Sequence, residues 1–235
     1  MMEKLYGSAI RFAAQPQVHV LKMQFHFMTN YNYLIVDPVS RQAVIVDPAW
    51  EMEKVDAALA ECDATLAGIL VTHSHPDHLN LAGPLAERRQ CPIWMSHDEI
   101  AYSGFSHPRL QGIATAPWYV GALQIQPVHT PGHTPGCYCY LIGDNLFTGD
   151  VLFAEGCGMC PDTPGAHAMY ASLEYLKALL EPHTRVYPGH SYGKAPGTRF
   201  DQILQDNIYL QFSDRDTFAA FRMRKVQSRV NMFGQ

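Results

Sequence analysis

A histidine-rich hexapeptide, His-Ser-His-Pro-Asp-His at 73–78, directly follows the apolar run at 67–72. The apolar run predicts a buried strand. Three imidazoles and one carboxylate at the end of that strand are ligand types that zinc and other first-row metals accept. The chain must therefore fold so that a strand ends where metal-ligating side chains gather.

The order of residues within the hexapeptide divides its ligands between two positions. Side chains alternate along an extended segment, so His73 and His75 are expected to point to the same side. A turn at Pro76 lets Asp77 and His78 point to a neighbouring position. One short segment can thus supply parts of two adjacent metal sites.

Three further candidate ligands follow predicted strands or occupy turns. They are His133 in Thr-Pro-Gly-His-Thr-Pro-Gly, Asp150 in Leu-Phe-Thr-Gly-Asp and His190 in Tyr-Pro-Gly-His. Glycine beside each one permits a tight turn and close approach to a metal. A carboxylate such as Asp150 can bridge two cations and offset their mutual repulsion.

Strand and helix patterns alternate along the chain in two similar halves, which predicts an α/β protein with sheets inside and helices outside. We expect one domain over 1–235 with a C-terminal helical segment at about 200–230. The segment 100–121 is expected to form a loop or a short helical insert over a cleft. The strands predicted at 31–36 and 43–47 form a hairpin, and further strands are predicted at 67–72, 122–128, 137–142, 145–148 and 185–188. Helices are predicted at 51–62, 168–180, 200–211 and 214–229.

Composition narrows the class of protein. The formal net charge of −5 argues against a dedicated nucleic-acid binder, and no apolar stretch is long enough to cross a membrane. Neither a signal peptide nor a disulfide scaffold is expected, because the N-terminus lacks a signal pattern and six cysteines in 235 residues are too few. These features predict a cytoplasmic protein.

The motifs together resemble the metallo-β-lactamase superfamily, and specifically its glyoxalase II-like branch. Five motifs occur in the family's order within about residues 30–195. They are Thr-His-Ser-His-Pro-Asp-His, Thr-Pro-Gly-His-Thr-Pro-Gly, Leu-Phe-Thr-Gly-Asp, Gly-Cys-Gly and Pro-Gly-His. The resemblance implies a four-layer αββα sandwich with the site along one edge of two sheets. It also implies that His73, His75 and His133 hold one metal, that Asp77, His78 and His190 hold a second, and that Asp150 bridges them.

The implied cofactor is a pair of divalent cations. Zinc is expected first, and the ligand types are also compatible with iron or manganese. Two such cations can lower the pKa of a shared water, so hydrolysis needs no serine or cysteine nucleophile. Asp77 is the expected catalytic residue, because it can orient the attacking water as well as bind metal.

The glyoxalase II-like branch mainly cleaves thioesters, which makes thioester hydrolysis the expected reaction. Glutathione-using members carry a lysine after Gly-Cys-Gly, where this chain has Met159, whereas Tyr192 matches a substrate-contacting tyrosine. Residues 152–200 resemble the hydrolases of trans-acyltransferase polyketide clusters, which implies an acyl group on a carrier protein. Arg222 and Lys225, in a basic C-terminal segment, are candidate contacts for the carrier or its phosphate.

Other activities stay open for this ligand set, and lactone hydrolysis is one of them. Hydroxyacylglutathione hydrolysis uses the same chemistry on a different thiol. An iron-dependent persulfide dioxygenase would retain similar motifs but use one iron and consume oxygen. Cys157 and Cys160 form a Cys-x-x-Cys, which is expected to lie in a loop at the edge of the active site.

Overall fold

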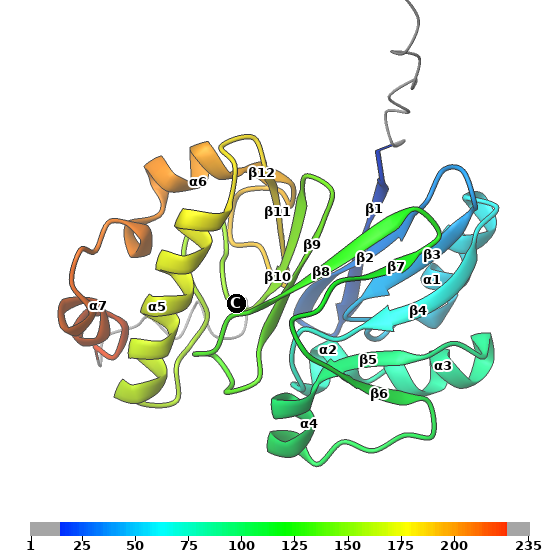
Figure 1. The fold of residues 1–235 in the computed structure, drawn as a ribbon, viewed down its shortest axis with the longest axis horizontal. Coiled ribbons are helices and arrows are strands. Elements are labelled where there is room, and N and C mark those ends of the chain that lie inside the picture. Colours follow the sequence, from blue (N-terminus) through cyan, green and yellow to red (C-terminus); the bar gives the residue numbers. More distant parts are fainter. Residues whose placement is uncertain (1–14, 225–235) are drawn as a thin grey trace, which may run out of the picture.

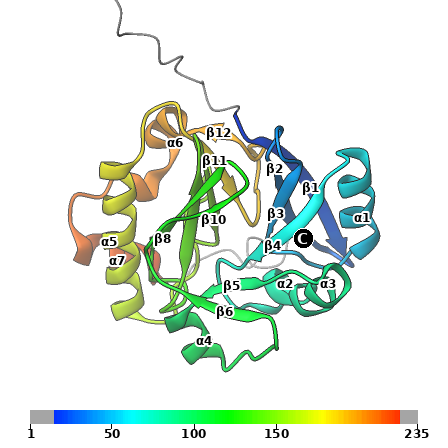
Figure 2. The same cartoon turned by 45° about the vertical axis from the view of Figure 1, so that its right-hand side comes forward.

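The computed structural model describes residues 15–224. Their helices and strands form four layers. Two six-stranded sheets lie face to face, and helices cover the outer side of each sheet (Figures 1 and 2). The side chains that the sheets direct at each other form a buried cluster that includes Tyr33, Leu70, Tyr140 and Phe147. The predicted αββα sandwich is confirmed.

The first sheet is built from the N-terminal half of the described chain. Its first three strands are antiparallel, and the next three continue the sheet in parallel. Helices α1 (Met52–Glu61) and α3 (Ala82–Arg89) cover it through an apolar cluster. In order across the sheet the strands are β1 (Gln17–Phe25), β2 (Met28–Val36), β3 (Gln42–Val46), β4 (Thr65–Leu70), β5 (Ile93–Ser96) and β6 (Leu110–Ile113).

The second sheet is antiparallel except for the parallel pair β10–β11. Helices α5 (Thr163–Leu179), α6 (Phe200–Asp206) and α7 (Arg215–Arg222) lie on its outer side, where a second apolar cluster packs (Figure 1). The strands are β7 (Trp118–Val120), β8 (Leu123–His129), β9 (Tyr138–Ile142), β10 (Asn145–Gly149), β11 (Arg185–Pro188) and β12 (Thr198–Arg199).

Most predicted elements occur where the sequence indicates them, including the β2–β3 hairpin and helices α1 and α5. The expectation for 100–121 is wrong. Within that segment, β6 and β7 form the edges of the two sheets, after the short helix α4 (His97–Ser103). The predicted helix at 200–211 divides into α6 and a 3-10 turn at Ile208–Leu210. Helix α7 ends at Arg222, and residues 225–229 lie outside the described part of the chain.

The carboxyl ends of four strands meet at one edge of the sandwich. Strands β3 and β4 are parallel neighbours in one sheet, and β10 and β11 are parallel neighbours in the other. Gly149, at the end of β10, has φ +48° and a Cβ there would lie 2.2 Å from Oγ1 of Thr72. Only glycine therefore lets the two sheets approach at this edge. Between residues 15 and 224, no helix is long and apolar enough to span a bilayer.

Candidate metal centre

Four separate segments bring the predicted ligands to this edge. The loop after β4 and the short helix α2 (Pro76–Leu79) carry the hexapeptide. His133 lies in the loop between β8 and β9, Asp150 directly follows β10, and His190 follows β11. All seven predicted ligands therefore lie in one place, although as many as 117 residues separate them along the chain, from 73 to 190.

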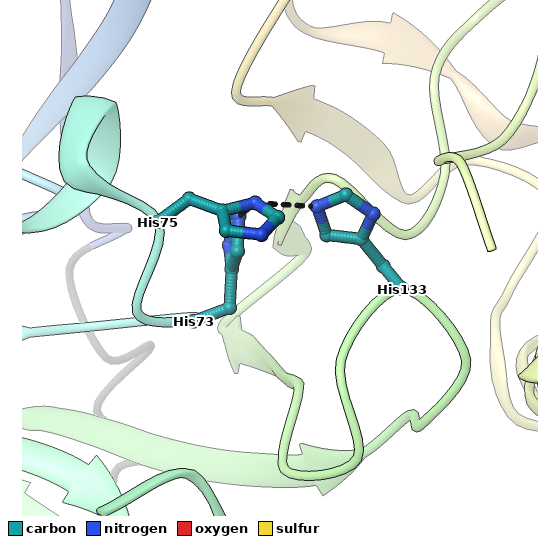
Figure 3. Close-up of side chains that lie close together, drawn as sticks. All are labelled: His73, His75 and His133. Carbon is teal, nitrogen blue, oxygen red and sulfur yellow. Dashed lines mark hydrogen bonds between the residues drawn. The ribbon is translucent and has the colours of Figure 1, made fainter. Parts of the chain in front are cut away.

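Three histidines converge through ring nitrogens (Figure 3). Nε2 of His73 lies 3.1 Å from Nδ1 of His75, and Nε2 of His133 lies 2.9 Å from the same atom. His73 is fully buried, and the other two side chains are partly buried. We call His73, His75 and His133 the first trio; it offers three imidazole nitrogens, which is a ligand set that suits zinc.

Asp77, His78 and His190 form a second trio beside the first. Oδ2 of Asp77 lies 3.6 Å from Nε2 of His78 and 3.3 Å from Nε2 of His190. All three ligand atoms lie within 4.8 Å of one another. The rings of His73 and His78 are 4.2 Å apart between centroids, so the two trios are direct neighbours.

Asp150 lies between the trios and presents one oxygen to each. Its Oδ1 is 3.4 Å from Nε2 of His78 and 3.6 Å from Nε2 of His190. Its Oδ2 is 3.7 Å from Nε2 of His133. This is the geometry expected of a carboxylate that bridges two cations.

Hydrogen bonds at the far side of three rings fix which nitrogen faces the centre. Nδ1 of His133 donates to the carbonyl oxygen of Met159 across 2.7 Å, and Nδ1 of His190 donates to that of Thr29 across 3.0 Å. Because a carbonyl oxygen only accepts, each Nδ1 carries the hydrogen and each Nε2 keeps a lone pair for a cation. Oγ1 of Thr72 gives its hydrogen to Oδ2 of Asp47, so at 3.0 Å from Nδ1 of His73 it accepts from that nitrogen and leaves Nε2 of His73 with its lone pair.

Asp47 is a buried carboxylate that the sequence analysis missed. Its Oδ2 lies 2.9 Å from Nδ1 of His78 and accepts from Oγ1 of Thr72 at 2.6 Å, while its Oδ1 accepts from the Thr72 amide at 2.7 Å. Asp47 also lies near enough to His73 and His78 to count as a possible ligand. Since its oxygens already serve three donors, we assign it the role of orienting His78 instead.

The charges at the centre balance one another and suit a cation. Burial disfavours protonation of His78, but the carboxylates of Asp150, Asp47 and Asp77 outweigh it and raise its pKa to about 10. Burial likewise works against ionised Asp150, yet the surrounding histidines hold its pKa below the usual value. Among the described residues, Nε2 of His78 and Oδ1 of Asp150 are buried without a hydrogen-bond partner. A divalent cation would satisfy both atoms, so the residues present fit a bound metal.

The two remaining exposed candidates lie close to the centre. Tyr192 is 49% exposed, and its ring contacts that of Phe153 at 5.4 Å between centroids. The side chain of Met159 is 41% exposed, while its carbonyl oxygen holds His133. The Gly-Cys-Gly-Met-Cys loop thus borders the centre, as the sequence predicts.

The expected position of Arg222 on an exposed basic edge is wrong. Its side chain is only 4% exposed, because α7 turns it inward against the second apolar cluster. Nη1 donates to the hydroxyl of Tyr209 across 3.0 Å, and Nη2 contacts the sulfur of Met159. Arg222 therefore supports the loop that carries Met159, and a direct substrate contact does not follow from its place. Lys225 lies outside the described residues.

Two further polar residues around the centre also escaped the sequence analysis. Glu99 is fully buried and accepts from the amide of Ser74 at 2.7 Å and from Oγ1 of Thr134 at 2.6 Å, so it joins the loops on which the first trio lies. Asn30 donates to Oδ2 of Asp77 across 3.0 Å. Neither residue belongs to a motif. The only sequence signal for Asn30 is that it is a polar residue within a largely apolar stretch.

Comparisons with known proteins agree with this geometry. The model of the "Metallo-beta-lactamase superfamily" matches residues 28–190, a span that includes all seven candidate ligands. The chain is 42% identical over 216 residues to the "Probable polyketide biosynthesis zinc-dependent hydrolase PksB" of Bacillus subtilis, covering 91% of this chain and 96% of that protein.

Two other similarities are more distant. A hydroxyacylglutathione hydrolase of Alkalilimnicola ehrlichii is 39% identical over 195 residues, covering 83% of this chain and 74% of that protein. The crystal structure of ETHE1 from Myxococcus xanthus superposes with a TM-score of 0.78 at 32% identity, covering 92% of this chain and 94% of that one.

Proposed function

The chain belongs to the metallo-beta-lactamase superfamily and is a metal-dependent hydrolase, and from this premise we propose that it hydrolyses acyl thioesters on the phosphopantetheine arm of acyl carrier proteins. Water and the thioester would give a carboxylic acid and a free thiol. One observation carries the hydrolytic part of the proposal most directly. Asp150 lies between two trios of ligand atoms with one oxygen toward each.

In this proposal the two trios hold two divalent cations, with zinc favoured by the names of the relatives. When bound, such a pair lowers the pKa of a water molecule and polarises the carbonyl of the substrate. The first trio would hold one cation, the second trio the other, and Asp150 would contribute an oxygen to each. Iron and manganese are compatible with the same ligand types.

The chain's own residues would orient the reactants. Asp77 would act as the catalytic residue, because its Oδ2 faces His78 and His190, and these histidines keep its pKa low against the effect of burial. An ionised carboxylate at this place can accept a hydrogen bond from the attacking water and aim it at the carbonyl carbon. Tyr192, half-exposed beside Phe153, would contact the substrate at the rim of the site.

The similarity to a polyketide biosynthesis hydrolase favours a carrier protein as the source of the thioester. Met159 stands where glutathione-using relatives are expected to carry a lysine, and a thioether cannot pair with a glutathione carboxylate. A cytoplasmic location fits this proposal, because all six cysteines are free thiols.

Hydroxyacylglutathione hydrolysis is the second candidate, favoured by the 39% identity to a protein of that name. Both candidates share the metal centre and differ in the thiol that leaves. A persulfide dioxygenase differs in chemistry, because it would need one iron and would consume oxygen.

One panel of substrates separates these activities. The same acyl group is presented as a thioester of acyl carrier protein, coenzyme A and glutathione, with thiol release measured at equal concentrations. We expect the highest kcat/KM for the carrier-protein thioester and no oxygen uptake with a persulfide. A preference for the glutathione thioester would overturn the proposed substrate, and oxygen consumption would overturn hydrolysis.

A further inference from the structure

Trp50 follows strand β3 in a backbone conformation that bulky residues rarely adopt, with φ +65°. Its indole Nε1 donates to Oδ1 of Asn30 across 3.2 Å. Its amide donates to Oδ1 of Asn80 across 2.9 Å, and Asn80 follows directly on α2, the helix that carries Asp77. Such strain persists where the surroundings fix a residue in place, often at functional sites.

Asn30 connects Trp50 to a candidate metal ligand, Asp77. Its side chain is 1% exposed, and its Nδ2 donates to the carbonyl oxygen of Asp77 across 2.9 Å and to Oδ2 of Asp77 across 3.0 Å. The same Oδ2 faces His190 at 3.3 Å. The oxygen that Asn30 holds is therefore the one that Asp77 contributes to the second trio.

The indole determines which way round the amide of Asn30 lies. An indole N–H can only donate, so it requires the amide oxygen of Asn30 on its side. The amide NH₂ then faces Asp77, where a carboxylate can only accept. The opposite orientation would place an amide oxygen against the ionised carboxylate of Asp77. Phe25 stacks on the indole at 4.5 Å between centroids and 10° between planes, which holds the ring in this position.

We propose that Trp50 is a positioning residue for the second metal site and acts through Asn30 on Asp77. This inference rests on the proposed pair of metals. Since no corresponding link runs from Trp50 to the first trio among the described contacts, its loss should weaken the second site selectively. Residues that orient a ligand from outside typically change metal affinity about 10- to 100-fold.

The test measures zinc affinity separately for the first and the second equivalent, by competition with a chromophoric chelator. Trp50→Phe removes the N–H and keeps an aromatic ring for Phe25. Trp94→Phe is the matched control, because Nε1 of Trp94 donates across 3.0 Å to the side-chain oxygen of Gln111, a residue of β6 that belongs to neither trio. We expect Trp50→Phe to weaken the second equivalent about 3- to 10-fold, Asn30→Ala to weaken it about 10- to 100-fold, and Trp94→Phe to change neither.

A double-mutant cycle shows whether Trp50 acts through Asn30. In the Asn30→Ala background, Trp50→Phe should cause no further loss of affinity, because the link is already broken. Three results would each overturn the inference. Trp50→Phe could weaken zinc affinity equally for both equivalents, it could keep its full effect in the Asn30→Ala background, or its effect could be no larger than that of Trp94→Phe. Wild-type protein that binds no second zinc would instead overturn the proposed pair of cations on which this inference rests, so the two failures are distinguishable.

Discussion

Nδ1 of His78 donates to Oδ2 of Asp47 across 2.9 Å, and both side chains are almost completely buried. Asp47→Asn keeps the volume of the side chain but removes the charge that holds His78 in place. We expect zinc affinity at the second site to fall about 10- to 100-fold, as measured by chelator competition. Asp144→Asn is the control, because Asp144 pairs with His183 at 3.6 Å on the surface. Equal affinities for the two variants would contradict the role of Asp47.

Glu99 joins two loops of the first trio through Ser74 and Thr134. Glu99→Gln replaces one accepting oxygen by an NH₂ group, which leaves a buried donor unmatched. We expect the free energy of unfolding to fall by about 1–3 kcal/mol, measured by denaturant titration of the metal-free protein. Glu87→Gln, on a side chain that is 73% exposed, should change it by less than about 0.5 kcal/mol. A stability of Glu99→Gln equal to that of the wild type would show that the loops need no such link.

Arg222 donates to Tyr209 and supports the loop of Met159 from inside the protein. Arg222→Met should lower the free energy of unfolding by about 1.5–3 kcal/mol, because hydrogen bonds from a charged group are lost. Since the loop also holds His133, kcat/KM should fall by the same factor for a carrier-protein thioester and for a small thioester. Arg224→Met, on the exposed side chain that lies over Phe221, is the control for stability. Selective loss of activity on the carrier-protein substrate would instead assign Arg222 to carrier binding.

All six cysteines are buried free thiols. Burial raises the pKa of Cys160 to about 11 against the opposing charge of Arg222, and it raises that of Cys139 to about 12. At pH 8 almost no thiolate is present, so native protein should react slowly with a disulfide reagent such as Ellman's reagent. Unfolded protein should release six equivalents at once. Rapid labelling of one or two native thiols would contradict the raised pKa values, because a reactive cysteine needs thiolate at this pH.

The sequence predicts the seven candidate ligands because each lies in a short motif beside glycine or after an apolar strand. Those features are local: alternation in an extended segment places His73 and His75 on one side, and the turn at Pro76 directs Asp77 and His78 to a neighbouring position. The residues that orient the ligands are different. Asp47 is 31 residues from His78 along the chain, and Asn30 is 47 residues from Asp77, so only the packing of the sheets brings each pair together.

Sequence patterns also did not predict the burial of Arg222 or the edge strands β6 and β7. Arg222 has the sequence context of a solvated helix face, and only the packing of α7 on α5 turns it inward. Strands β6 and β7 have four and three residues, which is too short for a clear periodic pattern. Their pairing with β5 and β8 supplies the hydrogen bonds that make them strands.

Metal content per chain, measured by mass spectrometry on metal-replete wild-type and Asp150→Asn protein, tests whether the two trios share a pair of cations. We expect two zinc ions per wild-type chain and about one or fewer in Asp150→Asn, because the amide cannot neutralise two adjacent charges. Thioester hydrolysis should appear only as the second equivalent binds. Wild-type protein that hydrolyses thioesters without bound metal, or Asp150→Asn protein that keeps both ions, would contradict a bridging role for this carboxylate.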